Sequence, residues 1–517
     1  MQIINKSYLK ILPSEFSEQV AKEYSEFLSK EHKKELGQFF TPLKIANFMV
    51  GLIDIDFASK TLRILDPGCG TLTLTCSLVE RLIQRNKNIK KIEIDVYDTD
   101  PLLSSVIINV SNQLKSWSNE QGVIVIINHI ISDFLLANRL ILKSNMDSPK
   151  YDLIISNPPY FKIGKEDARL SVFNTQFKGQ QNIYSLFLLG AAKLLNTYGQ
   201  LVFIVPRSFT SGLYFQSFRD AFFDEIIFKH FHLFDSRTNG FRKDQVLQEN
   251  IILKATSKSV NSRNIVKISS SSGINDLIAI KEKEFSIELL IKKLGKFNVI
   301  HLPVNLSEER AMRLFSTWTH NLSSFGMKVS TGPIVPFRCQ PYLKQENFKK
   351  SNCVPLLWMH NCLKMELNWP YKKKDKAEWI IDNSHSNSKT LQNHNYIILR
   401  RFSSKDDQSK LVATPHLKEN FNFSRIGIEN HLNYLYRPNG ILEKDEIFGL
   451  SVLYNSSLFD SYFRSLSGNT QVSATELNVL PLPPLEIIKK IGLQYMSLNG
   501  HGINEIDNIV NRTFNLT

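Results

Sequence analysis

The chain has 517 residues, a formal net charge of +14 and five cysteines. A chain of this length can bury a large core and is expected to form two or more domains. Its positive charge favours a polyanionic partner, although ribosomal and membrane-surface proteins are also basic. The few cysteines exclude a disulfide framework, and no apolar run is long enough to span a bilayer. We therefore expect a cytoplasmic protein that does not enter a membrane.

The N-terminal half of the chain has alternating helix and strand patterns. Phe16, Val20 and Tyr24 recur at helical spacing, which predicts an accessory helix before about residue 30. An amphipathic helix is predicted over residues 43–52 and a core helix over residues 183–195. Strand and helix patterns alternate to about residue 255, which predicts an α/β fold with a doubly wound, mostly parallel sheet.

The pattern changes beyond residue 255. Residues 257–273 are rich in Ser and Asn around a short strand pattern at residues 265–268, and we expect either an edge of the first domain or the exit from it here. Residues 282–297 are charged and predicted to be helical. From about residue 310 the patterns are mixed and short, as expected for a separate α+β domain.

Candidate ligand-binding residues follow the first two predicted strands. One apolar strand ends at Asp66 and leads into a turn that contains Gly68 and Gly70. The glycines permit close approach of the backbone to a ligand, and Asp66 can hold the amino group of an amino-acid moiety. The next strand, residues 92–97, ends at Asp98, where a carboxylate can accept from both hydroxyls of a ribose.

A third predicted strand, residues 123–127, leads to Asp133 and Phe134. Asp133 can accept from the amino group of an adenine, and Phe134 can pack on the ring. Each of these candidates lies at or just past the carboxyl end of a strand, which is where doubly wound sheets bind ligands.

The tetrapeptide Asn157-Pro158-Pro159-Tyr160 follows a fourth apolar strand pattern and is typical of sites that methylate a planar nitrogen. Such a nitrogen is a poor nucleophile, and two acceptors aimed at its protons draw the lone pair toward sp3 character. The side-chain oxygen of Asn157 and the Pro158 carbonyl are the predicted acceptors, because the prolines hold that carbonyl rigidly. Tyr160 offers a flat face for a ring to stack on. An ordinary Pro-Pro turn is the alternative.

In this order, the motifs resemble those of the gamma class of S-adenosylmethionine-dependent DNA adenine methyltransferases, the TaqI-like methylases. Residues 37–42 resemble the family's first cofactor motif, which implies that Phe39 and Thr41 contact the methionine part of S-adenosylmethionine. Residues 241–250 resemble the motif that supplies a second aromatic wall, which implies that Phe241 stacks on the target base. The resemblance also implies that Asn157 contacts both the target base and the cofactor.

The C-terminal half resembles the PstI/BsuBI branch of type II restriction-modification methylases. The similar segments are residues 329–333, 335–338, 399–405, 427–431, 468–477 and 480–484. The resemblance implies a catalytic domain with an N-terminal helical extension over residues 1–305, a DNA target-recognition domain over residues 306–490 and a tail over residues 491–517. Basic and aromatic residues interleave between Arg338 and Lys418, which suits a nucleic-acid surface. For the lysine run at residues 372–376, a solvated loop is the alternative.

The implied activity is that of a site-specific, adenine-specific DNA methyltransferase. It rotates an adenine out of double-stranded DNA and transfers a methyl group to its 6-amino nitrogen, with CTGCAG as the implied target sequence. The enzyme is implied to be a monomer that protects DNA in a restriction-modification system. We expect the cognate endonuclease on a separate chain, because no nuclease motif is present.

Three alternatives keep part of this interpretation. RNA adenine is one possible acceptor, and a protein glutamine is another, because release-factor glutamine methyltransferases also carry an Asn-Pro-Pro-Tyr motif. An inactive DNA-binding restriction component is the third. No metal is expected, since the spacing of Cys353, His360 and Cys362 fits no common zinc site.

Overall fold

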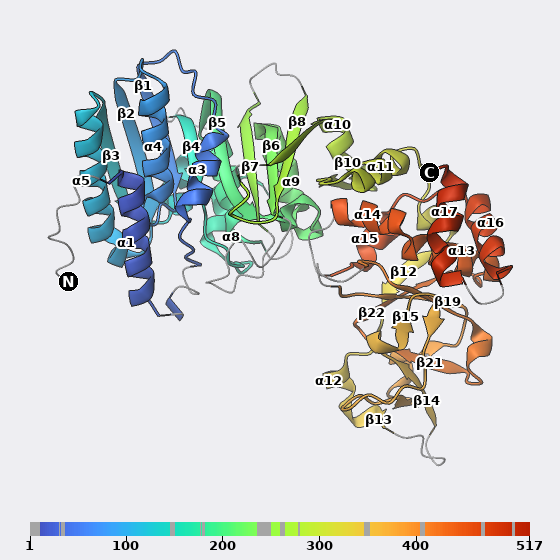
Figure 1. The fold of residues 1–517 in the computed structure, drawn as a ribbon. Coiled ribbons are helices and arrows are strands. Elements are labelled where there is room, and N and C mark those ends of the chain that lie inside the picture. The colour runs from blue at the N-terminus through green and yellow to red at the C-terminus, as the bar shows by residue number, and fades with distance from the viewer. Residues whose placement is uncertain are drawn as a thin grey trace. The chain divides into compact units, whose positions relative to one another are not determined.

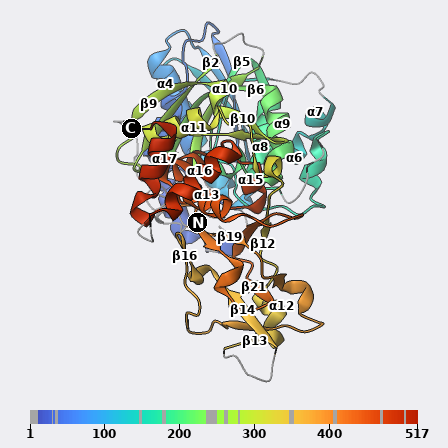
Figure 2. The ribbon, with the colours of Figure 1, turned by 90° about the vertical axis from the view of Figure 1, so that its right-hand side faces the viewer.

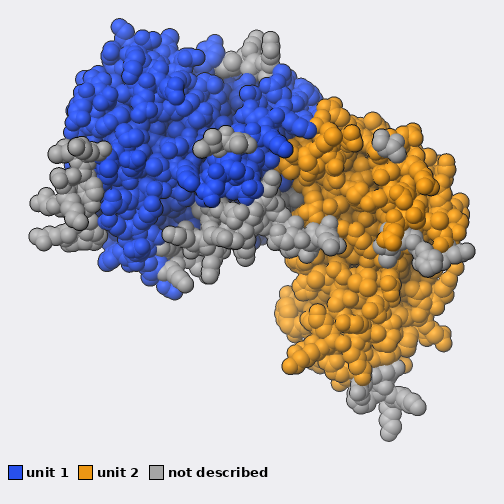
Figure 3. Space-filling model, in the orientation of Figure 1, with its two compact units in different colours: residues 1–292, 297–302 blue, residues 293–296, 303–517 orange. Residues whose placement is uncertain are grey.

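The computed structural model describes residues 11–29, 31–32, 37–144, 150–175, 177, 181–234, 250–258, 264–277, 280–345, 352–403, 409–466, 471–498 and 502–516. The chain divides into two compact units (Figure 3). Unit 1 comprises residues 1–292 and 297–302, and unit 2 comprises residues 293–296 and 303–517. Within the described ranges, no helix is both long and apolar enough to cross a membrane.

Unit 1 is built on a sheet whose described strands have the order β3-β2-β1-β4-β5-β7-β6-β8-β9 (Figure 1). The first five in this order run parallel to one another: β3 (Ile124–Ile131), β2 (Lys91–Asp98), β1 (Thr61–Pro67), β4 (Tyr151–Ser156) and β5 (Leu195–Pro206). The other strands are β7 (Asn250–Ser257), antiparallel to both β5 and β6 (Ile226–Phe234), and then β8 (Ile265–Ser271) and β9 (Lys281–Ser286). The predicted α/β, mostly parallel sheet is confirmed.

The centre of the sheet consists of strands that are buried on both faces. Leu62 and Ile64 of β1 and Leu153 and Ile155 of β4 are fully buried, which explains their continuous apolar sequences. Ile64 pairs with Leu153, so β1 and β4 are neighbours. The strand order reverses between these two strands, since β2 and β3 lie beyond β1 and β5 lies beyond β4. Such a reversal leaves a crevice at the carboxyl ends of the strands.

The helices of unit 1 form two packed groups. One consists of α1 (Pro13–Phe27), α3 (Leu43–Gly51), α4 (Thr73–Arg85) and α5 (Ser104–Glu120). The other consists of α6 (Phe134–Ala137), α7 (Arg139–Ser144), α8 (Ile183–Lys193) and α9 (Gln216–Glu225). The predicted accessory helix is confirmed as α1, which buries Phe16, Val20 and Tyr24. The helices predicted over residues 43–52 and 183–195 are confirmed as α3 and α8.

The helix predicted over residues 282–297 is wrong. This segment contains most of strand β9, a single helical turn, α10 (Ile287–Leu290), and strand β10 (Ile291–Leu294), which pairs with β11 (Phe297–Ile300). The side chains of residues 281–284, Lys-Glu-Lys-Glu, are exposed, and β9 pairs only with β8 among the described strands. Charged side chains suit such an edge strand, because they discourage pairing with another chain.

Unit 2 has the predicted α+β architecture, with two small sheets and a group of helices (Figures 1 and 2). One sheet contains β12 (Lys328–Thr331), β22 (Leu432–Tyr436), β19 (Tyr396–Arg400) and β20 (Ala413–His416), all antiparallel. The other contains β13 (Leu343–Lys344), β17 (Trp379–Ile381), β14 (Cys353–Leu357), β21 (Arg425–Ile428) and β18 (Leu391–Gln392). A short hairpin joins β15 (Cys362–Leu363) to β16 (Glu366–Leu367).

The helices of unit 2 are α11 (Leu306–Phe315), α12 (Pro336–Cys339), α13 (Lys444–Asn455), α14 (Ser457–Leu466), α15 (Ala474–Val479), α16 (Leu485–Met496) and α17 (Ile506–Phe514). The backbones of α13 and α16 touch at two glycines. A Cβ atom on Gly449 would lie 2.0 Å from the Ile488 carbonyl oxygen, and one on Gly492 would lie 1.9 Å from that of Asp445. Only glycine permits this helix spacing.

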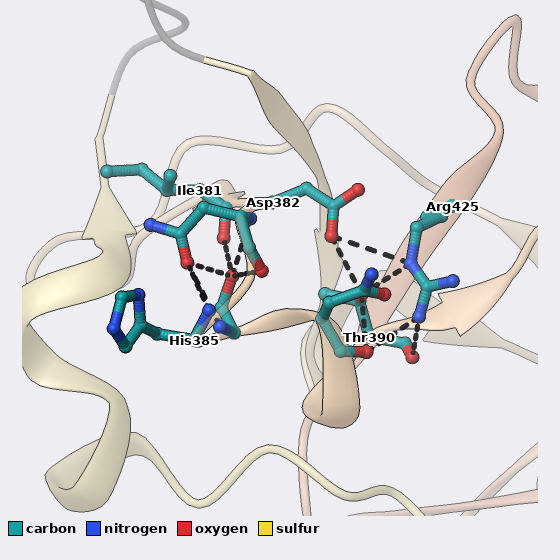
Figure 4. Close-up of polar contacts among 8 residues, drawn as sticks. Ile381, Asp382, His385, Thr390 and Arg425 are labelled. Carbon is teal, nitrogen blue, oxygen red and sulfur yellow. Dashed lines mark hydrogen bonds and ion pairs between the residues drawn. The ribbon is translucent and has the colours of Figure 1, made fainter.

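The loop between β17 and β18 is fastened to β21 by polar contacts (Figure 4). Arg425 donates from Nε to the Thr390 hydroxyl at 2.7 Å and from Nη2 to the Thr390 carbonyl oxygen at 2.6 Å. The same hydroxyl donates to Asp382 at 3.0 Å, and this carboxylate lies 3.5 Å from Arg425. The loop therefore has a defined path across the end of the sheet.

Candidate active site

A cavity of about 350 Å³ lies at the carboxyl ends of β1, β2 and β4. Seven of the predicted site residues line it: Phe39, Gly68, Gly70, Asp98, Asp133, Phe134 and Asn157. Residues that the sequence did not single out also line it, among them Gln38, Tyr97, Pro159, Phe161, Arg169 and Phe187. The strand-end motifs therefore converge on one cavity, although they come from segments more than 100 residues apart in the chain.

The Gly-rich turn folds over the end of β2. Gly68 has φ +92° and Gly70 has φ +53°, the left-handed region that favours glycine. The Gly68 and Cys69 amides both donate to the Tyr97 carbonyl oxygen at 2.9 Å. The Gly70 amide donates to the Asp98 carboxylate at 3.1 Å, which orients this carboxylate at the cavity wall. Burial raises the pKa of Asp98, so its charge is poorly solvated until a ligand donates to it.

Asp66 lies beneath this turn and is fully buried. The Thr75 hydroxyl donates to Oδ2 at 2.7 Å, whereas Oδ1 has no hydrogen-bond partner among the described residues. Burial raises the pKa of Asp66 to about 7, opposed by the Thr75 hydrogen bond and assisted by the charge of Asp98. The side chain is not part of the cavity lining. An unpaired carboxylate oxygen at this depth suits a cationic partner such as an ammonium group.

Asp133 and Phe134 form another part of the wall, together with Arg169. Asp133 caps α6, since its Oδ1 accepts from the amides of the second and third residues that follow it, at 2.9 and 3.0 Å. Its Oδ2 lies 3.5 Å from Arg169, whose guanidinium also pairs with Asp167 at 2.6 Å. The Phe134 ring is buried edge-on against Tyr97. Arg169 lies in a short 3-10 helix, η2 (Ala168–Val172), and no sequence pattern marks it as part of the site.

The Asn157 side chain is held in one orientation. Its Nδ2 donates to the Phe39 carbonyl oxygen at 2.8 Å and to the Thr41 hydroxyl at 3.1 Å. Both amide protons are therefore engaged, and Oδ1 is left as an acceptor, with the Tyr160 hydroxyl hydrogen-bonded to it. Thr41, predicted to contact the cofactor, does not line the cavity but fixes this amide.

The remaining predicted site residues, among those the structure describes, do not line the cavity. Tyr160 is 7% exposed, does not line the cavity, and its hydroxyl lies 2.7 Å from the Ile204 carbonyl oxygen. The rings of Tyr160 and Phe39 are nearly parallel, with centroids 6.0 Å apart and an interplanar angle of 20°. Pro158 is buried, and Pro159 rather than Pro158 lines the cavity. Phe241 lies outside the described residues.

A further carboxylate, Asp100, connects the N-terminal segment to the cavity. It is 2% exposed and accepts hydrogen bonds from Tyr24 at 3.1 Å, His32 at 3.0 Å and Gln38 at 2.9 Å. Burial raises the pKa of Asp100, but the bonds from His32 and Gln38 outweigh it, so the pKa is lowered overall. Since Gln38 lines the cavity, this cluster positions one of its walls. No sequence pattern indicates this cluster, because its donors come from separate segments.

Comparisons with known proteins agree with this geometry. Residues 70–241 match the family of the Eco57I restriction-modification methylase. The chain is 32% identical to the type II methyltransferase M.PstI of Providencia stuartii over 94% of each chain. It is 31% identical to M.BsuBI of Bacillus subtilis over 89% of this chain and 90% of that protein. It is also similar to a tRNA1(Val) (adenine(37)-N6)-methyltransferase of Trichodesmium erythraeum (strain IMS101), 29% identical over 30% of this chain and 55% of that protein.

The fold is that of an S-adenosylmethionine-dependent methyltransferase. The chain belongs to the type II restriction-modification methyltransferases, which methylate DNA, as the similarity to M.PstI and M.BsuBI along nearly its whole length shows.

Proposed function

We propose that this enzyme methylates the 6-amino group of an adenine rotated out of double-stranded DNA. The observation that carries the proposal is the orientation of Asn157. Both protons of its amide are donated to Phe39 and Thr41, so the side chain can offer a substrate only its oxygen, which is an acceptor. An exocyclic amino group is the part of a base that offers two protons to such acceptors. The Pro158 carbonyl is the proposed second acceptor.

The chemistry of the nearby cysteine also favours an amine over a ring carbon. Methylation of a ring carbon requires a nucleophile that first adds to the ring. Cys69 in the Gly-rich turn is buried, and burial together with Asp98 raises the pKa of its thiol well above the ordinary value. Such a thiol is a poor nucleophile. The name of the Trichodesmium erythraeum relative specifies adenine N6, which supports the same acceptor atom.

S-Adenosylmethionine, when bound, supplies a methyl group on a sulfonium. We propose that Asp98 accepts from the ribose hydroxyls, that Asp133 and Phe134 hold the adenine ring, and that Gly68 and Gly70 allow the backbone to lie close to the cofactor. We also propose that the unpaired Oδ1 of Asp66 accepts from the ammonium of the methionine part, which requires the turn above it to open, because the side chain is fully buried and does not line the cavity. Phe39 and Thr41 act through Asn157 rather than as cofactor ligands alone, because both accept from its amide.

The flipped base requires a stacking surface. Each base–aromatic stack contributes roughly 1–3 kcal/mol, against a flipping cost of a few kcal/mol. We propose Tyr160 as one wall. Two residues are candidates for the other: Phe241, implied by the family motif, and Phe39, whose ring is already nearly parallel to that of Tyr160. Stacked planes lie about 3.4 Å apart, so a base between Phe39 and Tyr160 requires these rings to separate to about 7 Å.

The same proposal assigns the rest of the chain. Residues 1–305 act as the catalytic domain, residues 306–490 recognise the DNA sequence, and residues 491–517 form a C-terminal tail. Likeness to the PstI/BsuBI branch supports CTGCAG as the target, a monomeric enzyme and a cognate endonuclease on a separate chain.

Modified-base sequencing tests the proposal. DNA from a methylation-free host that expresses the chain should carry methyladenine in one sequence motif, and DNA from a host expressing Asn157→Ala should not. Methylcytosine in place of methyladenine would refute the proposed acceptor. Unmodified DNA from cells whose purified enzyme binds S-adenosylmethionine would point to RNA or a glutamine as the acceptor, and methyl transfer to total RNA and to release factors would separate these two.

A further inference from the structure

A second cavity, of about 440 Å³, lies in unit 2. It is formed where β14, β19 and β21 end, so both sheets of the unit contribute to it. Trp358 and Met359 follow β14, Arg400 ends β19, and the Glu429–His431 turn follows β21. The cavity is distinct from the active site, which is formed by unit 1 alone.

Basic groups surround this cavity. Lys373, Lys376 and Arg400 line it, and the Lys376 ammonium lies 4.4 Å from the centroid of the buried Trp358 ring. Arg400 donates from Nε to the Cys362 carbonyl oxygen at 2.7 Å, which fixes the guanidinium at the rim. The pKa of His360 is lowered, first by burial and then by the positive charges of Lys373 and Lys376. The cavity therefore has a positive potential, as expected of a site for a polyanion.

The one carboxylate among the lining residues, Glu429, is buried and pairs with a half-exposed histidine. Glu429 is 1% exposed and accepts hydrogen bonds from the backbone amide of His431 at 3.0 Å and from its ring nitrogen Nδ1. The His431 side chain is 51% exposed. Because Nδ1 is committed to the carboxylate, Nε2 is the nitrogen available to a ligand, and in a neutral ring it is an acceptor. Phe402 packs against the same ring, with centroids 5.0 Å apart.

We propose that this cavity is a DNA-contacting site, in which Lys373, Lys376 and Arg400 bind phosphates and His431, oriented by Glu429, contacts a base edge. Two of the three basic groups are lysines, whose long side chains suit contacts with successive phosphates along a strand. A fixed imidazole acceptor suits an exocyclic amino group in the major groove, that is, cytosine N4 or adenine N6. This inference rests on the proposed function only in taking DNA as the substrate.

The experiment measures the affinity of the full-length enzyme for two duplexes as a function of salt concentration. One duplex contains the motif found by modified-base sequencing, and the other has the same length and composition without it. The Lys373→Ala/Lys376→Ala variant should weaken binding to both duplexes and reduce the slope of log K against log[salt] by about 1.8, since each phosphate contact contributes about 0.9. Lys490→Ala removes an exposed lysine of the same unit far along the chain and should leave the slope unchanged.

The base contact has a different signature. His431→Ala should weaken binding to the motif-containing duplex by about tenfold or more and leave binding to the other duplex unchanged. His431→Phe keeps a ring against Phe402 and should show the same loss, so the effect cannot be attributed to lost packing. Retained binding of S-adenosylmethionine by each variant shows that unit 1 is folded, and an unchanged thermal unfolding midpoint shows the same for unit 2.

Wild-type salt slopes in the lysine variant, or equal losses on both duplexes in the histidine variants, would overturn the assignment. If the wild-type enzyme methylates adenine and the variants give either of these results, this inference is refuted and the proposed function stays intact. A wild-type enzyme that methylates no DNA would refute the proposed function, while the binding slopes would still decide the role of this cavity.

Discussion

The side-chain nitrogen of Asn157 donates to the backbone carbonyl oxygen of Phe39 at 2.8 Å. This bond joins a residue just after β4 to a segment that precedes α3, 118 residues earlier in the chain. Together with the bond to Thr41, it determines which atom of the amide can meet the substrate. The orientation of the proposed catalytic acceptor thus depends on a second segment, which supplies the acceptors for its nitrogen.

Replacing Asn157 tests this acceptor directly. Asn157→Ala should reduce the single-turnover rate of methyl transfer by about 100-fold or more, because the transition state loses a preorganised hydrogen bond. The dissociation constant for S-adenosylmethionine should change little, since Asp98 and Asp133 are untouched. Near wild-type turnover in this variant would remove Asn157 from the mechanism.

Replacing Thr41 tests whether the orientation of the Asn157 amide matters for turnover. Thr41→Val keeps the shape of the side chain but removes the oxygen that accepts from Asn157 at 3.1 Å. The amide can then rotate, and we expect the turnover number to fall about tenfold with the cofactor affinity maintained. Thr41→Ser retains the hydroxyl and should keep wild-type turnover. If the Ser and Val variants behave alike, the hydroxyl does not position Asn157.

Asp100 should control the cofactor site through the segments that it binds. Asp100→Ala leaves the donors of Tyr24, His32 and Gln38 without their shared acceptor. Each lost hydrogen bond costs about 1 kcal/mol, so we expect weaker binding of S-adenosylmethionine by at least tenfold in calorimetry. Tyr24→Phe removes one of these bonds and should have a smaller effect. Glu120→Ala, an exposed acidic residue at the end of α5, is the matched control. Unchanged affinity in Asp100→Ala would show that the cluster does not support the cofactor cavity.

The contact between α13 and α16 predicts a loss of stability. In Gly449→Ala the added methyl group would lie 2.0 Å from the Ile488 carbonyl oxygen, which is a backbone atom that cannot turn away. We expect the helices to separate at a cost of about 1–3 kcal/mol, measured as a lower midpoint of urea unfolding. Gly164→Ala, where nothing lies within 4 Å of the added group, should have no comparable effect.

Two buried histidines predict acid sensitivity. Ser269 lies between His230 and His232, at 2.7 and 2.9 Å, and burial lowers the pKa of His230 to about 4 and that of His232 to about 3. In the unfolded chain both would titrate near pH 6.5. Between about pH 6.5 and pH 4 the unfolded state therefore binds more protons, and the stability falls as the pH is lowered.

The magnitude of this effect should be about 1–2 kcal/mol for each histidine between pH 7.5 and pH 5. Urea unfolding of wild type and of His230→Gln/His232→Gln at both pH values provides the measurement, with the difference between the two pH dependences as the result. Equal pH dependences in the two proteins would contradict the assignment.

The catalytic half was largely predictable because its signals are local. Asp66 and Asp98 lie at the carboxyl ends of the apolar strands β1 and β2, Asn157 directly follows β4, and neighbouring parallel strands bring these ends together. Arg169 and Asp100 were not predictable in their roles, since their partners come from loops and from a helix distant in sequence. Residues 282–297 were misassigned because the charge pattern of an exposed edge strand is also that of a solvated helix.

The organisation of the C-terminal half could be predicted only from the family resemblance. Several of its strands, such as β13 and β18, are two residues long and are defined by pairing with distant segments. No periodicity can develop in two residues. The second cavity likewise combines residues from three strand ends, and its members were visible in the sequence only as scattered basic and aromatic residues.

If Asp66 holds the ammonium of the cofactor as proposed, capture of the cofactor is a proton-coupled event. With a pKa raised by burial to about 7, this carboxyl is partly protonated in the free enzyme at neutral pH. An ammonium brought to it would favour the ionised form, so binding should expel a fraction of a proton into the buffer. The apparent binding enthalpy would then vary with the ionisation enthalpy of the buffer, and the enzyme would hold its methyl donor more weakly in acidified cells.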